Sequence, residues 1–305
     1  MSDVIEWKDK ELILHTFQQS HVNGGRLSKF WVEDRLSHRE FMLKGSTHFG
    51  YEPLSEKIAY EVGKALGIDV LEYDIVPLEL FEDKLPLNSH CGYVSICEKI
   101  DRKGYSITSV AEIKRARNTV EKSLHKDSKY CKVYTNREIM YELLSKKYID
   151  RMFLFDAIIG NKDRHYGNVH LLRGRDGRII GAPIIDNGDS CLATTRTIHL
   201  QLLGYNIGKV IDESATIEKK HEKQIMYADT LNGIDFDIPT KTIEILEAIQ
   251  STLDLMPKQR ANAVEKYLVY RLHKYLGLIK RSEIPCIEAV ARDDVVRVIN
   301  EKEHT

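Results

Sequence analysis

The chain has 305 residues, of which 42% are hydrophobic and 30% charged, a balance typical of a folded protein and too apolar for a disordered one. Its formal net charge of −1 provides no global basic field, which argues against nucleic-acid binding through bulk charge. The N-terminus is charged from Asp3 onward and no window holds 18 consecutive apolar residues, so we expect neither a signal peptide nor a membrane span. The five scattered cysteines include no C-x-x-C pair, which favours reduced thiols and a cytoplasmic location. Export by a route without a signal peptide stays open.

The first hundred residues favour short β-strands. Segments rich in β-branched and aromatic residues alternate with polar, turn-prone stretches, which predicts a meander of antiparallel strands. One amphipathic helix is expected at 53–66, ending before Gly67, because apolar residues recur there every four positions. The predicted strands are 12–14, 29–33, 39–44, 71–80 and 92–97.

Beyond about residue 103 the pattern becomes helical. Thr135 and Glu138 form a capping-box pattern that opens a long amphipathic run reaching Ile159. The overall prediction is an α+β fold with a strand-rich lobe at 1–99, a mainly helical lobe at 100–305, and a cleft at their junction near 98–103. Further helices are expected at 241–256, 257–276 and 287–300.

The segment with the clearest chemistry is the loop from Gly160 to His170. It carries Asp163 and, five residues later, Asn168, in a stretch whose glycines and Asn161 break regular structure. Phosphoryl transfer from ATP needs a group that orients the acceptor hydroxyl and oxygen ligands for Mg²⁺. An aspartate and an asparagine on one loop supply both, although each residue alone is an ordinary turn former.

A second metal ligand is expected at Asp186. An apolar run leads to this aspartate, and Gly188 is expected to let the chain turn sharply after it. The segments 169–172 and 178–185 have the pattern of a hairpin turning at 175–177. Such a hairpin brings Asn168 and Asp186 to the same end of two paired strands, where they can share a cation.

The motif Asp163-Arg164-His165-x-x-Asn168, followed by Asp186, resembles the catalytic loop and metal-binding aspartate of HipA-like serine/threonine kinases, in particular their stand-alone type. Phosphatidylinositol kinases share the loop. The resemblance implies a two-lobed, protein-kinase-like fold with an antiparallel-sheet N-lobe and a mainly helical C-lobe. It implies that Asp163 is the catalytic base or hydroxyl-orienting residue and that Asn168 and Asp186 bind Mg²⁺. His165 either assists in proton handling or braces the loop, and Arg164 is expected to brace it too.

Lys44 and Glu56 are the candidates for gripping the ATP phosphates. Lys44 ends a predicted strand and would place its ammonium group on the α- and β-phosphates, while Glu56, early in the next helix, matches the family's lysine-holding glutamate. A strand-end lysine is also commonly a solvated edge charge.

Two further segments complete the expected nucleotide site. Gly24, Gly25 and Arg26 would form a loop over the phosphates, with Lys29 as an alternative basic residue, although a plain hairpin turn has the same pattern. Backbone groups of Glu98 and Ile100, in the segment that resembles the linker between lobes, would bind the adenine edge.

These features lead to three hypotheses. The leading one is a protein serine/threonine kinase that uses Mg-ATP and transfers the γ-phosphate to a hydroxyl of a protein acceptor. A kinase of lipids or small molecules is the enzymatic alternative. A catalytically inactive kinase fold acting as a binding module is disfavoured, because Lys44, Asp163, Asn168 and Asp186 are all present.

Overall fold

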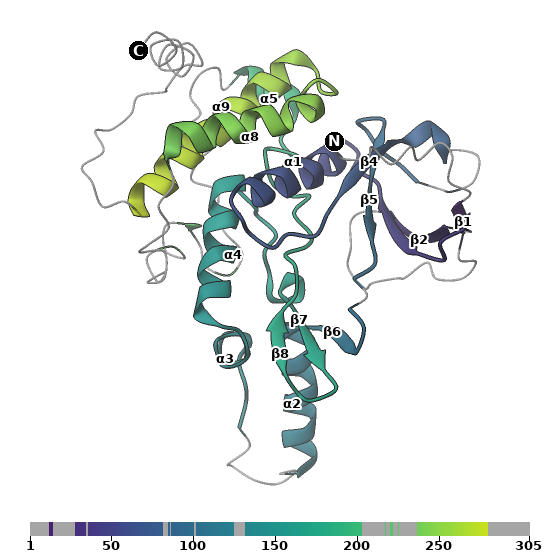
Figure 1. The fold of residues 1–305 in the computed structure, drawn as a ribbon, viewed down its shortest axis with the longest axis vertical. Helices are drawn as coiled ribbons and strands as arrows, with labels where there is room; N and C mark the ends of the chain where they lie inside the picture. The colour runs from purple at the N-terminus through teal and green to yellow at the C-terminus, as the bar shows by residue number, and fades with distance from the viewer. Residues whose placement is uncertain are drawn as a thin grey trace.

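The computed structural model places one large antiparallel sheet, one small sheet and a set of helices (Figure 1). The predicted glycine loop at 24–26 and the predicted helix at 287–300 lie outside the residues that it describes. The described residues are 12–14, 28–34, 36–81, 85, 87–100, 102–124, 132–202, 217, 220–221, 225 and 237–279.

The larger sheet has five strands in the order β1-β2-β3-β5-β4, and every neighbouring pair is antiparallel. Lys44, at the end of β3, pairs with Lys29 of β2 on one side and with Ser95 of β5 on the other. The strands are β1 (Leu12–Leu14), β2 (Lys29–Asp34), β3 (Glu40–Lys44), β4 (Asp74–Pro77) and β5 (Tyr93–Glu98). The predicted strand at 71–80 is shorter than expected, since a 3₁₀ turn (η2, Leu78–Leu80) ends it.

The two faces of this sheet differ in chemistry. Because directly paired residues point to the same face, Trp31, Met42 and Cys97 share a face with Lys29 and Lys44. The other face is apolar and forms a separate core. That core comprises Val32, Phe41, Leu43, Val76, Phe81, Leu85, Leu87, Val94 and Ile96.

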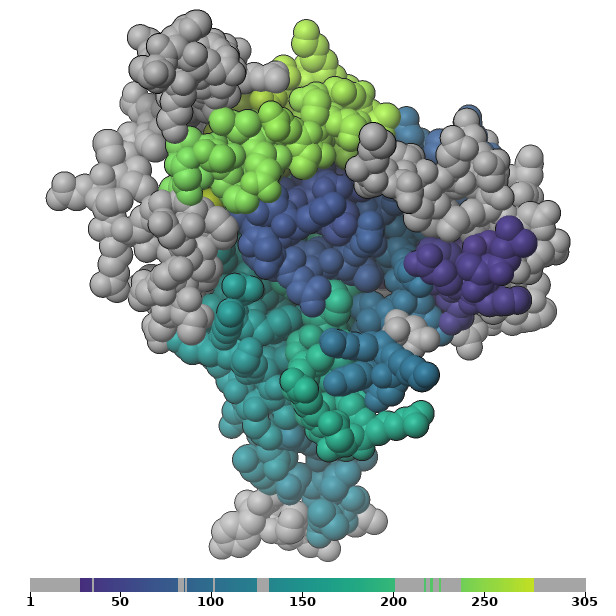
Figure 2. All heavy atoms as spheres, in the orientation of Figure 1, coloured from purple at the N-terminus to yellow at the C-terminus, as the bar shows by residue number. Residues whose placement is uncertain are grey.

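Helix α1 (Glu52–Ala65) follows β3 and confirms the predicted helix. Pro53 lies in its first turn, a position that needs no intrahelical N–H. Leu54, Ile58 and Val62 are fully buried along one face. This face packs against helix α8 (Ile238–Leu253), and Figure 2 shows the two helices in direct contact.

The smaller sheet combines β6 (Tyr105–Ser109), β7 (His170–Gly174) and β8 (Ile179–Gly181) in that order. β7 and β8 form the predicted hairpin, with Gly177 at a φ of 82° in the turn. Helix α2 (Val110–Leu124), for which no bounds were predicted, continues directly from β6.

The predicted long helix is two helices, α3 (Asn136–Leu143) and α4 (Lys146–Ile159). The predicted capping box at Thr135 is present, but Ser145 starts a new helix by accepting a hydrogen bond from the amide of Tyr148. A Ser N-cap therefore interrupts a run whose apolar spacing is continuous.

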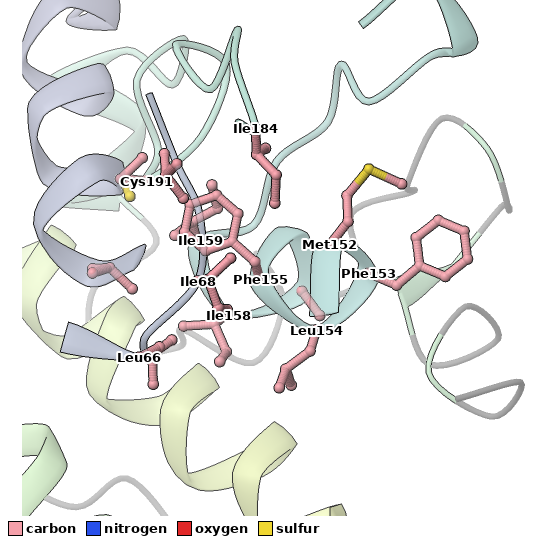
Figure 3. Close-up of a cluster of buried hydrophobic side chains, with 14 of the residues drawn as sticks. Leu66, Ile68, Met152, Phe153, Leu154, Phe155, Ile158, Ile159, Ile184 and Cys191 are labelled. Atoms are coloured by element: carbon pink, nitrogen blue, oxygen red, sulfur yellow. The ribbon is translucent and has the colours of Figure 1, made fainter. Parts of the chain in front are cut away.

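Helix α4 is the centre of the main hydrophobic core. Ten of its residues are buried, and Figure 3 shows Phe155, Ile158 and Ile159 surrounded by side chains from other segments. Helix α9 (Lys258–Ile279) packs against α4, α8 and the short α5 (Thr197–Leu202). Among the described helices, none is long and apolar enough to cross a bilayer.

Candidate active site

Lys44 is the centre of a buried charged cluster. Its ammonium group donates hydrogen bonds to Glu56 Oε1 at 2.9 Å, to Tyr73 Oη at 2.8 Å and to Asp186 Oδ1 at 2.7 Å. Its side chain is only 2% exposed, and so is that of Glu56. The three partners come from α1, from the segment before β4 and from the segment after β8. The predicted Lys44–Glu56 pair is therefore present and also includes Asp186.

The charges in this cluster stabilise one another. Burial opposes the charged form of Lys44, but Asp186 and Glu56 outweigh it and raise its pKa well above the ordinary value. Burial likewise opposes the charged form of Asp186, yet the ammonium groups of Lys44 and Lys29 hold its pKa well below the usual range. Lys29 Nζ lies 3.7 Å from Asp186 Oδ1. Two lysines therefore face one carboxylate, an arrangement suited to polyanion binding.

Asp163 lies on the loop that leaves α4. Gly160 ends the helix in the left-handed conformation, with a φ of 66°, and the amide of Asp163 donates to Asn161 Oδ1 at 2.9 Å. The side chain of Asp163 is 55% exposed, so a substrate can reach it. Partial burial, together with the charges of Asp189 and Asp186, raises its pKa above the ordinary aspartate value. A carboxylate in such surroundings is a better proton acceptor than a free one.

Arg164 braces this loop from inside the protein, as expected. Its side chain is fully buried and makes an ion pair with Asp156, and Nη2 donates to Asn187 Oδ1 at 2.6 Å. Nη1 donates to two carbonyl oxygens, Asn168 O at 3.0 Å and Ile185 O at 2.6 Å. One guanidinium group therefore ties the loop that carries Asp163 to the segment that carries Asp186.

Asn168 and Asp186 are suited to hold a divalent cation. Asn168 Nδ2 donates to Asp163 O at 2.8 Å, which fixes the amide group and leaves its oxygen available to a ligand. An amide oxygen and a carboxylate are hard donors of the kind Mg²⁺ prefers. Among the described residues, no three His, Cys, Asp or Glu side chains cluster as a complete metal site. Two donors do not complete the coordination shell of Mg²⁺, so a cation held here would take its other ligands from phosphates and water.

The chain turns at Asp186 itself, contrary to the expectation for Gly188. Asp186 has a φ of 60°, whereas Gly188 is not among the glycines with positive φ. A Cβ atom at Gly188 would lie 3.2 Å from Glu52 Cβ and 3.5 Å from Glu56 Oε1. A side chain at this position would crowd Glu52, so the absence of a Cβ atom eases the close approach of the backbone to α1. Non-glycine residues in the left-handed region are uncommon and concentrate at functional sites.

His165 contacts both the loop and the predicted catalytic aspartate. Its Nδ1 accepts a hydrogen bond from the amide of Gly167 at 3.0 Å, which caps the 3₁₀ turn η3 (Tyr166–Asn168). Its Nε2 lies 3.9 Å from Asp163 Oδ1. The first contact is the bracing interaction, and the second leaves the proton-handling alternative open.

The predicted adenine-binding segment lies where the chain leaves the larger sheet for the smaller one. Glu98 ends β5 and pairs with Arg39, and the amide of Lys99 donates to Glu40 O at 2.8 Å. Ile100 follows, and β6 begins at Tyr105. Glu98 and Ile100 therefore lie at the opposite end of β3 from Lys44.

Two buried residues of the site were not predicted. Tyr73 is fully buried beside Lys44, with the ammonium group 4.9 Å from its ring centroid. The backbone amide of Asn187 donates to Glu56 Oε2 at 2.9 Å, so Glu56 is held from two sides. Tyr73 has no motif signal, and Asn187 is recognisable only as the neighbour of Asp186.

The two sheets, the helices and the charged cluster between them form a two-lobed, protein-kinase-like α+β fold, as the sequence predicts. No protein-family model matches the chain. It is similar to the serine/threonine-protein kinase CtkA of Helicobacter pylori (strain J99), with 29% identity over 179 residues, or 56% of this chain and 51% of CtkA. The matched part is thus about half the length of this curated relative.

One solved structure extends the likeness in fold. The crystal structure of the Helicobacter pylori proinflammatory kinase CtkA matches with a TM-score of 0.53 over 86% of this chain and 94% of that chain, at 18% identity. The choline kinase LicA from Streptococcus pneumoniae covers 82% of this chain, with a TM-score of only 0.26 and 12% identity. The sequence and fold matches to CtkA confirm the expected likeness of this chain to a kinase of that type.

Proposed function

We propose that this chain is a protein serine/threonine kinase of the HipA-like kind, which uses Mg-ATP and transfers the γ-phosphate to a hydroxyl of a protein acceptor. The observation that carries the proposal is the buried Lys44 ammonium group, held between Glu56 and Asp186, together with the exposed carboxylate of Asp163, whose pKa the charge of Asp186 helps to raise. The sequence likeness to CtkA supports the same activity. The cytoplasm is the proposed location.

Each residue has a distinct role in this proposal. Lys44 binds the α- and β-phosphates, and Glu56 keeps its ammonium group in place. Asp163 orients the acceptor hydroxyl and receives its proton. Asn168 and Asp186 hold the magnesium ion, which neutralises phosphate charge when bound.

The nucleotide base is proposed to lie against the face of the sheet that carries Trp31 and Met42. Backbone groups of Glu98 and Ile100 would bind the adenine edge at one end of this face, and Lys44 lies at the other. The glycine loop with Gly24, Gly25 and Arg26 would cover the phosphates.

Nucleotide binding and phosphate transfer are tested separately. A Trp7→Phe variant leaves Trp31 as the only tryptophan, so ATP with Mg²⁺ should change its fluorescence in a saturable way. Radiolabelled ATP with a generic protein acceptor should yield labelled product with wild type and none with Asp163→Asn or Asp186→Asn. Equal labelling by all three proteins contradicts the assigned roles. No labelling and no nucleotide response favours the inactive binding module.

A further inference from the structure

A group of exposed basic and aromatic side chains lies beyond the end of β3. It consists of His48, Phe49, His90 and Arg196 and is called the Phe49 patch below. Phe49 is 42% exposed, and the Arg196 guanidinium carbon lies 4.3 Å from its ring centroid. The imidazole rings of His48 and His90 lie 4.4 and 6.1 Å from that ring. Three separate chain segments therefore converge on one exposed phenyl ring.

The patch lies at the phosphate end of the proposed nucleotide site. β3 begins beside the Glu98–Ile100 segment and ends at Lys44, and the patch loop follows directly. The amide of Tyr51 donates to Ala193 O at 3.1 Å, so this loop is joined to the segment that follows Asp186. The same segment contacts the catalytic loop, where the amide of Lys162 donates to Asp189 O at 3.0 Å. The patch loop and the Asp163 loop are therefore joined to the same segment, and we expect a bound acceptor to extend from Asp163 toward the patch.

The segment that carries Arg196 is held in place by hydrogen bonds from the buried side chain of Arg260. Arg260 of α9 is fully buried, and it donates to Leu192 O at 3.0 Å, to Thr195 O and to Thr197 Oγ1 at 3.2 Å. Its guanidinium carbon also lies 4.0 Å from the ring centroid of Tyr51. The patch is thus a preformed surface, which lowers the entropic cost of binding.

The guanidinium group of Arg196 makes no ion pair with a carboxylate in the part of the chain that the structure describes, and its recorded contact is with the Phe49 ring. Two carboxylates lie nearby. Glu52 is buried and accepts a hydrogen bond from Thr47 Oγ1 at 2.7 Å, and Asp189 accepts one from Thr194 Oγ1 at 2.8 Å. Both carboxylates thus have hydroxyl partners of their own, and an exposed guanidinium group without a carboxylate in contact favours an anion at the surface.

We propose that the Phe49 patch binds an acidic side chain, aspartate or glutamate, of the acceptor protein, close in sequence to the hydroxyl that is phosphorylated. The inference rests on the proposed function and specifies its acceptor. Arg196 supplies a charge-assisted hydrogen bond to the carboxylate, the imidazoles supply further N–H groups, and Phe49 contacts the aliphatic part of the side chain. Because extended chain advances about 3.3–3.6 Å per residue, the acidic position is fixed relative to the phosphorylated one.

The test uses peptides with one serine and with glutamate, glutamine or phosphoserine at each flanking position in turn. At one or two positions, glutamate should raise kcat/KM about two- to fivefold over glutamine, the range of an exposed ion pair. Arg196→Gln should remove this preference and leave the KM for ATP unchanged. Arg137→Gln is the matched control, since Arg137 is also exposed, with its guanidinium carbon 5.7 Å from the Tyr141 ring centroid, on the distant helix α3. It should keep the preference.

A binding measurement separates this inference from the proposed function. Fluorescence polarisation of the labelled glutamate and glutamine peptides, with a non-hydrolysable ATP analogue, reports the patch without phosphate transfer. Selective binding of glutamate peptides that depends on Arg196 supports the inference even if no peptide is phosphorylated. The lack of phosphorylation would then overturn the kinase activity alone. Phosphorylation without a glutamate preference overturns the inference alone. A preference only for phosphoserine, or one lost equally in Arg137→Gln, also overturns it.

Discussion

Replacing Arg164 by lysine should damage both the stability of the protein and its proposed metal site. A lysine has one nitrogen, so it can keep the ion pair with Asp156 but leaves Asn168 O, Ile185 O and Asn187 Oδ1 without their donor. Each buried acceptor that loses its partner costs about 1–3 kcal/mol. The lower limit for three acceptors gives a loss of about 3 kcal/mol in the free energy of unfolding, or about 5 °C in Tm.

Urea unfolding followed by circular dichroism measures the stability, and radiolabel transfer measures the activity. Arg271→Lys is the matched control, because Arg271 is also fully buried but donates to Ala157 O and lies against the rings of Tyr267 and Tyr275. This control should lose stability while keeping the KM for ATP. If Arg164→Lys costs less than about 1 kcal/mol and retains wild-type activity, the bracing role is refuted.

Three other substitutions give direct outcomes. Lys44→Met should abolish phosphate transfer and weaken ATP binding, because Lys44 is the proposed phosphate ligand. It should also lower the free energy of unfolding by about 3–5 kcal/mol, because it breaks a buried ion pair. Unchanged ATP affinity in calorimetry would contradict the phosphate-binding role. Gly160→Ala should cost about 2–4 kcal/mol in urea unfolding, since the new Cβ would lie 2.0 Å from Tyr267 Oη at a φ of 66°; a neutral result would contradict the packing. Activity should fall as the pH drops through the raised pKa of Asp163, because the protonated carboxyl group cannot accept a proton. His165→Ala removes a charge that lowers this pKa, so the fall in activity at acid pH should begin at a higher pH. A shift to lower pH would refute the assignment of Asp163.

Features that depend on neighbouring residues in the sequence were predictable. The capping box at Thr135 is a contact over three residues, and the hairpin turn around Gly177 requires a residue that tolerates positive φ. The two strands of this hairpin run side by side, and the segments that flank them at Asn168 and Ile185 both accept hydrogen bonds from Arg164 Nη1. Short-range chemistry therefore predicted where the loops of the candidate site meet.

Features that depend on tertiary contacts were not predictable. Tyr73 has no marked sequence context, and only the folded chain places its hydroxyl group 2.8 Å from Lys44. Gly188 was expected to provide a turn, whereas the structure places it close to Glu52 of α1 without a positive φ. The break between α3 and α4 was missed because the apolar spacing continues across Ser145. In each case the sequence alone does not show which tertiary contacts the residue makes, and those contacts decide its role.

The burial of α1 limits how this molecule could be switched off. Leu54, Ile58 and Val62 belong to the same core as the helices α4, α8 and α9, so the helix that carries Glu56 is anchored along its length. Rotating it outward, to separate Glu56 from Lys44, would expose these side chains to water at about 1.5–3 kcal/mol each. A conformational inactivation of that type would amount to partial unfolding. Control of such a protein is therefore better placed at nucleotide entry, acceptor supply or cellular abundance than at this helix.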